Sequence, residues 1–197
     1  MEALKEKILK EGFAQGSSIV KVDGFINHRI DTKFMEEMGY EFRRRFADVE
    51  PTLLLTIETS GIAVAMGAAK AFGYLPMVFG KKTNPEKESG QASGLADDCY
   101  AATCISFTKG TTSIIKVKKD YIRPEDKVLI LDDFLAHGEA ASALCEICAQ
   151  AGAEVLGIGA AIEKQFQGGS AVLRGRGIRV ESLAVISAIN EGEIVFG

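Results

Sequence analysis

The fold is decided by one stretch of the chain, which reads Val128-Leu129-Ile130-Leu131-Asp132-Asp133-Phe134-Leu135-Ala136-His137-Gly138-Glu139-Ala140-Ala141. Its four leading apolar residues are typical of a strand that is buried on both faces. We expect the two adjacent carboxylates to end this strand, and a helix to begin near Glu139. Loop amides at a helix N-terminus can hold a phosphate, while carboxylates beside them can point at hydroxyl groups or a metal. The stretch therefore predicts an anion-binding site.

The acidic pair, Asp132 and Asp133, narrows the kind of anion. A nucleoside triphosphate pocket would carry a Gly-Lys-Ser or Gly-Lys-Thr segment, and the sequence contains neither. Two carboxylates before a phosphate loop suit a sugar with a 5-phosphate and free 2- and 3-hydroxyl groups. They can accept both hydroxyl protons and lie beside positive charge that develops at the anomeric carbon. The alternative interpretation is a core strand that ends in two solvated acids.

Length and composition fit one globular domain over residues 1–197. Hydrophobic residues make up 47% and charged residues 25% of the chain, and the net charge is −4. This acidic balance argues against nucleic acid and anionic membrane as partners. No apolar run is as long as a membrane span, and the first residues lack the apolar core of a signal peptide. We expect a cytoplasmic protein.

The cysteines and histidines offer little for a metal site or a catalytic triad. Cys145 and Cys148 have the C-x2-C spacing of a zinc site, but they fall at helical i, i+3 spacing within an Ala-rich apolar run. A buried free cysteine behaves as a small apolar residue. Only two histidines occur, His28 and His137, so a histidine-based triad has little material. We expect these cysteines to pack in the core.

Residues 1–48 lack the strand–helix alternation of the rest of the chain. They contain a charged helix up to Glu11, a short strand at 19–23 and a helix after Asp31, a plausible N-cap. Apolar residues recur along that second helix at i, i+4 spacing from Phe34 to Phe46, which is typical of a core face. We predict that residues 1–48 form a small hood and its flanking helix, and that residues 49–197 form the core and the closing strands.

Strands alternate with helices from Thr52 onward. A buried strand at 52–57 is followed by the turn Thr59-Ser60-Gly61, where Thr59 or Ser60 can cap the next helix. The polar segment 83–98 resembles an active-site lid in its length. Further strands are expected at the following ranges: 75–79, 99–107, 113–117, 154–162, 179–183 and 194–196. This order predicts a mostly parallel sheet with helices on both faces and a ligand beyond the carboxyl ends of its strands.

The strand, the acidic pair and the small-residue loop resemble the phosphoribosyl diphosphate (PRPP) motif of the type I phosphoribosyltransferases. Further segments match the bacterial xanthine phosphoribosyltransferases in order and approximate spacing. They are Met1-Glu2-Ala3-Leu4-Lys5, Lys21-Val22-Asp23-Gly24-Phe25-Ile26-Asn27-His28, Ile162-Glu163-Lys164-Gln165-Phe166-Gln167 and Arg179-Val180-Glu181-Ser182-Leu183-Ala184. The likeness covers nearly the whole chain. In the loop, however, Ala136-His137-Gly138-Glu139-Ala140 replaces the family's Ala-Asn-Gly-Gln-Ala.

The resemblance implies a reaction in purine salvage. PRPP, carrying Mg²⁺, and xanthine would give xanthosine 5′-monophosphate and diphosphate, in a homodimer with no metal bound directly by the protein. The residues that the resemblance assigns to PRPP are the acidic pair at the ribose and Ala136, His137, Gly138, Glu139, Ala140, Thr59, Ser60, Gly61, Lys81 and Lys82 at the phosphates. Those that it assigns to the purine are Val20, Asn27 and Lys164.

Two alternatives remain open at the level of sequence. The same chemistry could act on hypoxanthine or guanine. A non-catalytic PRPP-sensing regulator of purine genes shares the fold, but such proteins carry an N-terminal DNA-binding domain and a basic surface, whereas this chain is acidic and starts directly with the predicted hood.

Overall fold

The computed structural model describes residues 1–84, 98–106 and 111–197. Their central feature is an eight-stranded sheet in the order β10-β9-β8-β7-β3-β4-β6-β5. The strands are β3 (Leu53–Ile57), β4 (Met77–Thr83), β5 (Cys99–Ser106), β6 (Thr111–Lys118), β7 (Lys127–Leu135), β8 (Glu154–Lys164), β9 (Val180–Asn190) and β10 (Glu193–Phe196). The five adjacent strands β9, β8, β7, β3 and β4 are parallel to one another. At one edge β10 pairs antiparallel with β9, and at the other β6 pairs antiparallel with both β4 and β5.

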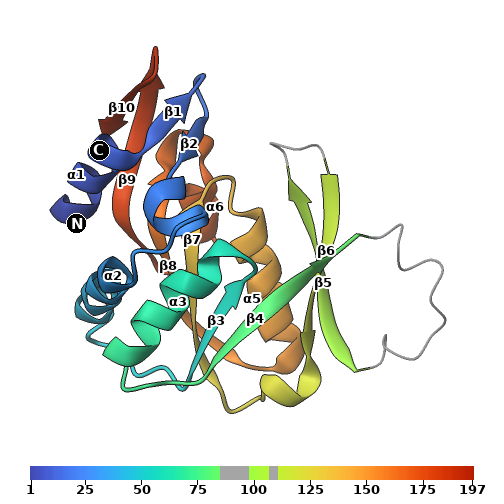
Figure 1. Cartoon of the computed structure of the whole chain (residues 1–197). Helices are drawn as coiled ribbons and strands as arrows, with labels where there is room; N and C mark the ends of the chain where they lie inside the picture. Colours follow the sequence, from blue (N-terminus) through green and yellow to red (C-terminus); the bar gives the residue numbers. More distant parts are fainter. Residues whose placement is uncertain (85–97, 107–110) are drawn as a thin grey trace.

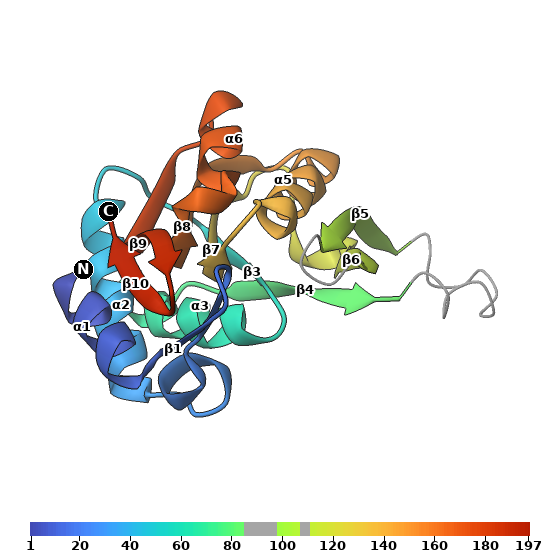
Figure 2. The ribbon, with the colours of Figure 1, turned by 90° about the horizontal axis from the view of Figure 1, so that it is seen from above.

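Helices cover both faces of this sheet (Figure 2). On one face, α2 (Thr32–Arg45) and α3 (Ser60–Ala71) pack on Leu54, Leu129 and Leu131. On the other face, α5 (Glu139–Ala151) and α6 (Gly169–Gly175) contribute to a second apolar cluster with the alternate residues of β3 and β7. The predicted mostly parallel sheet with helices on both faces is therefore confirmed. Because helices bury both faces, its central strands carry apolar residues on both sides.

The hood consists of α1 (Glu2–Glu11), β1 (Phe13–Gln15), β2 (Ile19–Lys21) and the π-helical turn η1 (Asp23–Asn27), with β10 alongside. Both chain ends lie in it (Figure 1). The amino group of Met1 donates to the carbonyl of Leu183, and Lys5 Nζ donates to the carbonyl of Gly197 at 3.3 Å. The predicted hood from the N-terminal segment and the chain end is therefore present.

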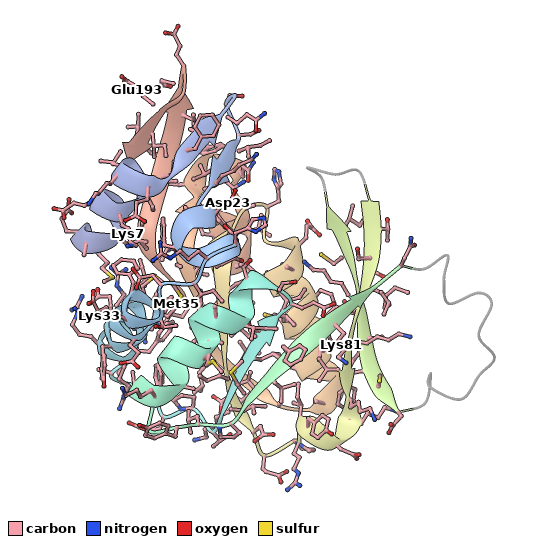
Figure 3. The ribbon with its side chains drawn as sticks, in the orientation of Figure 1. Lys7, Asp23, Lys33, Met35, Lys81 and Glu193 are labelled. Carbon is pink, nitrogen blue, oxygen red and sulfur yellow. The ribbon has the colours of Figure 1, made fainter. Side chains whose placement is uncertain are left out.

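A lysine joins the hood to the helix layer. Lys7, labelled in Figure 3, pairs with Asp31 at 2.9 Å and lies over the rings of Phe25 and Phe34, at 5.4 and 5.1 Å from their centroids. Asp31 is the N-cap of α2, as predicted, and accepts from the amide of Phe34. The apolar stripe of α2 is buried, so its interpretation as core is also confirmed.

Several boundaries differ from the prediction. The strand β7 continues to Leu135 instead of ending at the carboxylates, because Phe134 and Leu135 still pair with Ile162 and Glu163 of β8. Thr59 is the N-cap of α3 but makes no side-chain capping bond. The sequence reading also missed β1, η1 and α6, which are short or rich in glycine, and it placed β4 two residues early.

The cysteine pair lies where the helical spacing placed it. Cys145 and Cys148 are free thiols on α5, and burial raises the pKa of Cys148 to about 12. In the described ranges, no three side chains of His, Cys, Asp or Glu form a group that could hold a metal ion. Within the same ranges, no helix is long and apolar enough to cross a membrane. The predicted lid, 83–98, lies mostly outside the described residues.

Candidate active site at the carboxyl edge of the sheet

The loop 136–140 connects β7 to α5 and presents its backbone at the helix N-terminus. Gly138 is the N-cap of α5 and has a φ of 86°, a left-handed conformation that suits glycine. A cavity lies against this loop, and Lys82 and Asp132 also line it. Backbone amides at a helix N-terminus and the helix dipole favour an anion here. The structure thus brings together the loop and the first carboxylate of the quoted stretch.

A glycine pair after β8 braces this loop from outside, a feature that the sequence reading did not use. The amide of Gly169 donates to the carbonyl of Ala136 at 3.0 Å. A Cβ atom on Gly169 would lie 2.4 Å from that carbonyl oxygen and 2.6 Å from the nitrogen of Gly138, so only glycine fits. His137 Nδ1 lies 3.1 Å from the carbonyl oxygen of Gln167, and its Nδ1–H tautomer donates there. Consecutive glycines after a strand end are the signal that could have found the brace.

The acidic pair occupies the inner wall of the site. Asp132 is only 8% exposed and Asp133 is half-buried, which excludes the alternative of two solvated acids. The amide of Asp133 donates to Asp132 Oδ1 at 2.9 Å. Burial, and then the neighbouring charge of Asp133, raise the pKa of Asp132 well above its ordinary value. The protein therefore makes ionisation of Asp132 less favourable than that of a solvated aspartate.

The turn after β3 faces this pair. The peptide between Glu58 and Thr59 is cis, and Glu58 Oε1 accepts from the amide of Lys82 at 2.6 Å. A Cβ atom on Gly61 would lie 2.6 Å from Asp132 Oδ1. Glycine at this position therefore allows the start of α3 to approach the carboxylate closely, and the turn and the acidic pair share one face of the site.

The two lysines of β4 do not point to the same place. Lys82 pairs in register with the buried Ile115 and lines the cavity, whereas Lys81, labelled in Figure 3, pairs with Lys116. Successive side chains of a strand point to opposite faces of a sheet. The structure therefore brings Lys82 to the acidic pair and places Lys81 on the opposite face of the sheet. The two lysines, which the resemblance assigned together to the phosphates, cannot both face the same cavity of one chain.

Three residues predicted to contact the purine lie on the hood side of the site. Lys164, at the end of β8, donates to the carbonyl of Ser18 at 3.1 Å, and its Nζ lies 5.7 Å from the ring centroid of Phe134. Burial lowers the pKa of Lys164. Val20 is buried in β2 of the hood. Its side chain can therefore only pack against apolar groups, and a polar contact from this residue to a base would have to come from its backbone.

Asn27 connects the hood to the core. Its side-chain amide donates to Ser60 Oγ at 2.8 Å and to Asp133 Oδ2 at 3.0 Å. An asparagine amide nitrogen carries two hydrogens, so both are used by these acceptors. The sequence predicted a donor for a base at this position. The structure shows that this donor also connects the turn after β3 to the acidic pair.

Glu163, which belongs to a segment that matches the family but received no role from the sequence, supports the far end of β8. It is 1% exposed and accepts hydrogen bonds from Ser170 and from Ser182, the latter at 2.6 Å. These bonds fix the start of α6, whose first residue is the Gly169 that packs against the loop 136–140. A buried carboxylate at a strand end has no distinctive sequence pattern, so only the three-dimensional structure reveals this link.

Comparison with known proteins gives relatives that match along the whole chain. The xanthine phosphoribosyltransferase of Laribacter hongkongensis is 47% identical over 197 residues and covers 100% of both chains. The enzyme of Clostridium novyi is 45% identical over 196 residues, which is 100% of this chain and 99% of the relative. The chain belongs to the xanthine phosphoribosyltransferase family. No protein-family model matches it.

Solved structures agree with this xanthine phosphoribosyltransferase assignment at the level of the fold. Adenine phosphoribosyltransferase from Thermoanaerobacter pseudethanolicus superposes with a TM-score of 0.70 at 18% identity, covering 92% of this chain and 98% of its own. The enzyme from Saccharomyces cerevisiae gives a TM-score of 0.69 at 20% identity, covering 93% and 99%. The fold is therefore that of the type I phosphoribosyltransferases, as predicted.

Proposed function

We propose that this protein transfers the 5-phosphoribosyl group from PRPP to N9 of xanthine and releases diphosphate, which places it in purine salvage. The observation that carries the proposal is the full-length identity of 47% to a xanthine phosphoribosyltransferase. The site geometry supports it, since a loop packed against Gly169 lies beside an acidic pair whose first member, Asp132, is buried. We further propose that residues 1–197 act as one domain in the cytoplasm.

The sugar half of the substrate fits the loop and the acids. The ribose 5-phosphate would accept hydrogen bonds from the amides of residues 136–140, and Asp132 and Asp133 would face the ribose hydroxyl groups. Thr59, Ser60 and Gly61, together with Lys82, would hold the diphosphate as it leaves. Mg²⁺ enters as part of the substrate, bound to PRPP, and the protein needs no direct metal ligand.

The chemistry needs positioning and charge more than a protein nucleophile. As the bond from C1 to diphosphate breaks, the ribose gains oxocarbenium character, and the carboxylates stabilise this positive charge. The positive charge on the ribose develops beside buried Asp132, where electrostatic stabilisation is stronger than in water. As N9 bonds to C1, the bond from C1 to diphosphate breaks, and the N9 proton passes to the released diphosphate or to water, which completes the exchange.

The base would bind between the hood and the end of β8. Lys164 can donate to the 6-oxo group of xanthine, and the backbone at Val20 can take part from the hood. Asn27 would donate to the 2-oxo group by exchanging one of its present acceptors, Ser60 or Asp133, for the base. Adenine, with a 6-amino group, would offer Lys164 no acceptor.

We also propose a homodimer. Lys81 is exposed and points away from the cavity of its own chain. If a second copy packed on this face, Lys81 would place its positive charge beside the diphosphate bound in that second copy. Light scattering at micromolar concentration should give the mass of a dimer. A fully active protein with the mass of a monomer would contradict this assembly.

One experiment tests the activity directly. The purified protein is incubated with Mg-PRPP and, in separate reactions, with xanthine, hypoxanthine, guanine or adenine, and the nucleotide product is separated and quantified. We expect xanthosine 5′-monophosphate to form fastest, guanine to react weakly and adenine not at all. Preference for hypoxanthine would overturn the choice of base, and the absence of any nucleotide would overturn the transfer itself.

A further inference from the structure

Thr56 is a fully buried residue of β3 whose hydroxyl group has no hydrogen-bond partner among the residues that the structure describes. A buried hydroxyl without a partner destabilises a fold, because it loses its hydrogen bonds to water. Valine has nearly the same shape, is favoured in strands and would carry no such cost. The hydroxyl group of Thr56 therefore has no structural explanation in the state described.

The position of this hydroxyl suggests its use. The point where a Cβ atom on Gly61 would lie is 2.4 Å from Thr56 Oγ1 and 2.6 Å from Asp132 Oδ1. The two oxygens thus border the same small space, which exists because residue 61 is glycine. A hydroxyl group can donate, and an ionised carboxylate only accepts. Thr56 can therefore supply a donor, and ionised Asp132 an acceptor, at this space beside the start of α3.

We propose that Thr56 is a positioning residue for Asp132, whose ionised carboxylate accepts a hydrogen bond from the Thr56 hydroxyl group. The role rests on the proposed phosphoribosyl transfer, in which an ionised Asp132 faces positive charge at the ribose. Both oxygens lie within 2.6 Å of the point where a Cβ atom on Gly61 would lie, so a rotation of the Asp132 carboxylate can bring them to hydrogen-bond distance.

The other groups around Asp132 leave this donor without a substitute. Asp133, on the same strand, raises the pKa of Asp132 through its charge and a side-chain hydrogen bond, while its backbone amide donates to Asp132 Oδ1 at 2.9 Å and favours the ionised form. Lys82 approaches from β4 and favours the charge, while the thiol of Cys104 on β5 is a weak donor. From β3, Thr56 adds the neutral donor that an ionised carboxylate in this position needs.

The test compares Thr56→Val, which keeps the shape and removes the hydroxyl, with Thr56→Ser, which keeps the hydroxyl. Thr103→Val, at an exposed position of β5, controls for the same substitution elsewhere. For Thr56→Val we expect kcat to fall by about 10-fold and the acidic limb of the kcat profile to move up by about one pH unit. Its thermal midpoint at low pH should equal or exceed that of the unmutated protein. Thr56→Ser should restore kcat and the pH profile.

Two results would overturn the role. Thr56→Val could keep the kcat and pH profile of the unmutated protein, or both variants could lose activity equally with lower thermal midpoints, which would indicate packing. A measurement that needs no catalysis, the thermal midpoint as a function of pH, tests the role of Thr56 separately from the proposed function. If Thr56 stabilises ionised Asp132, the thermal midpoint of Thr56→Val should fall relative to the unmutated protein as pH rises. A constant difference would refute the role even if no base proved to be a substrate.

Discussion

The phosphate loop and the hood hold the two ends of the candidate site by different means. The loop is fixed through backbone atoms, with Gly138 in a left-handed conformation and Gly169 packed against its carbonyl and amide groups. The hood reaches the site through single side chains, of which Asn27 bonds Ser60 and Asp133. The difference teaches that backbone packing fixes the loop end, whereas the hood end depends on side-chain bonds that a base would have to exchange. Substitutions can test each half of this comparison.

The acidic pair stands between the two ends, and its removal should have the largest effect. We expect Asp132→Asn together with Asp133→Asn to lower kcat by at least about 100-fold, since a lost electrostatic contributor costs on that order. Steady-state kinetics with Mg-PRPP and xanthine measure it. Asp120→Asn, at an exposed position after β6, is the matched control. Near-normal turnover by the double variant would remove the pair from the mechanism.

The same double variant should be more stable at neutral pH. The folded protein raises the pKa of Asp132, so folding favours the proton, and stability is lost as pH rises above the ordinary carboxyl pKa. Asparagine carries no charge to bury, so the thermal midpoint of the variant should exceed that of the unmutated protein at pH 7 and converge with it at low pH. A lower midpoint at pH 7 would show that the carboxylates stabilise the fold.

Rigidity of the phosphate end predicts a second large effect. Gly169→Ala would bring a Cβ atom to 2.4 Å from the carbonyl oxygen of Ala136, so the loop must shift. A displacement of this kind can lower catalytic efficiency by about 100-fold. We expect the loss to show as a raised KM for PRPP. Gly175→Ala, in the same helix but with open space around its Cβ position, should leave kinetics unchanged. Equal KM values for the two variants would show that the loop is not pre-formed.

The sequence was most informative where main-chain geometry and burial decide the structure. Val128 to Leu131 and Gly138 were enough for the strand, the loop and the helix, because burial and the need for a left-handed residue leave a pattern. The partners of Asn27 and the opposite directions of Lys81 and Lys82 were not foreseen. The partners of Asn27 depend on how distant elements meet, which no local pattern encodes. The directions of Lys81 and Lys82 follow from strand alternation, but the expected strand ended at residue 79, before both lysines.

The base end should respond more weakly and more selectively. We expect Asn27→Ala to lower kcat/KM for xanthine by about 10-fold and to spare hypoxanthine, which lacks the 2-oxo group, while Lys164→Ala weakens both bases. Competition assays with the two bases measure the ratio. Because Asn27 also holds Ser60 and Asp133, equal losses for both bases would assign it to the ribose and diphosphate side instead.

The smallest effect is expected at Glu139, the first residue of α5, which lines the cavity beside the phosphate loop and is half-buried. Its negative charge opposes a phosphate at the same helix N-terminus, so Glu139→Gln should lower the KM for PRPP by about three-fold with kcat unchanged. The gain should shrink as salt is added, because exposed charges are screened. Glu146→Gln, on the exposed side of the same helix, controls for the loss of one charge and should change nothing. If Glu139→Gln instead raised the KM, the carboxylate would be a ligand of the substrate, for example through its Mg²⁺ or a hydroxyl group, and the phosphate end would then depend on a side chain as the hood does.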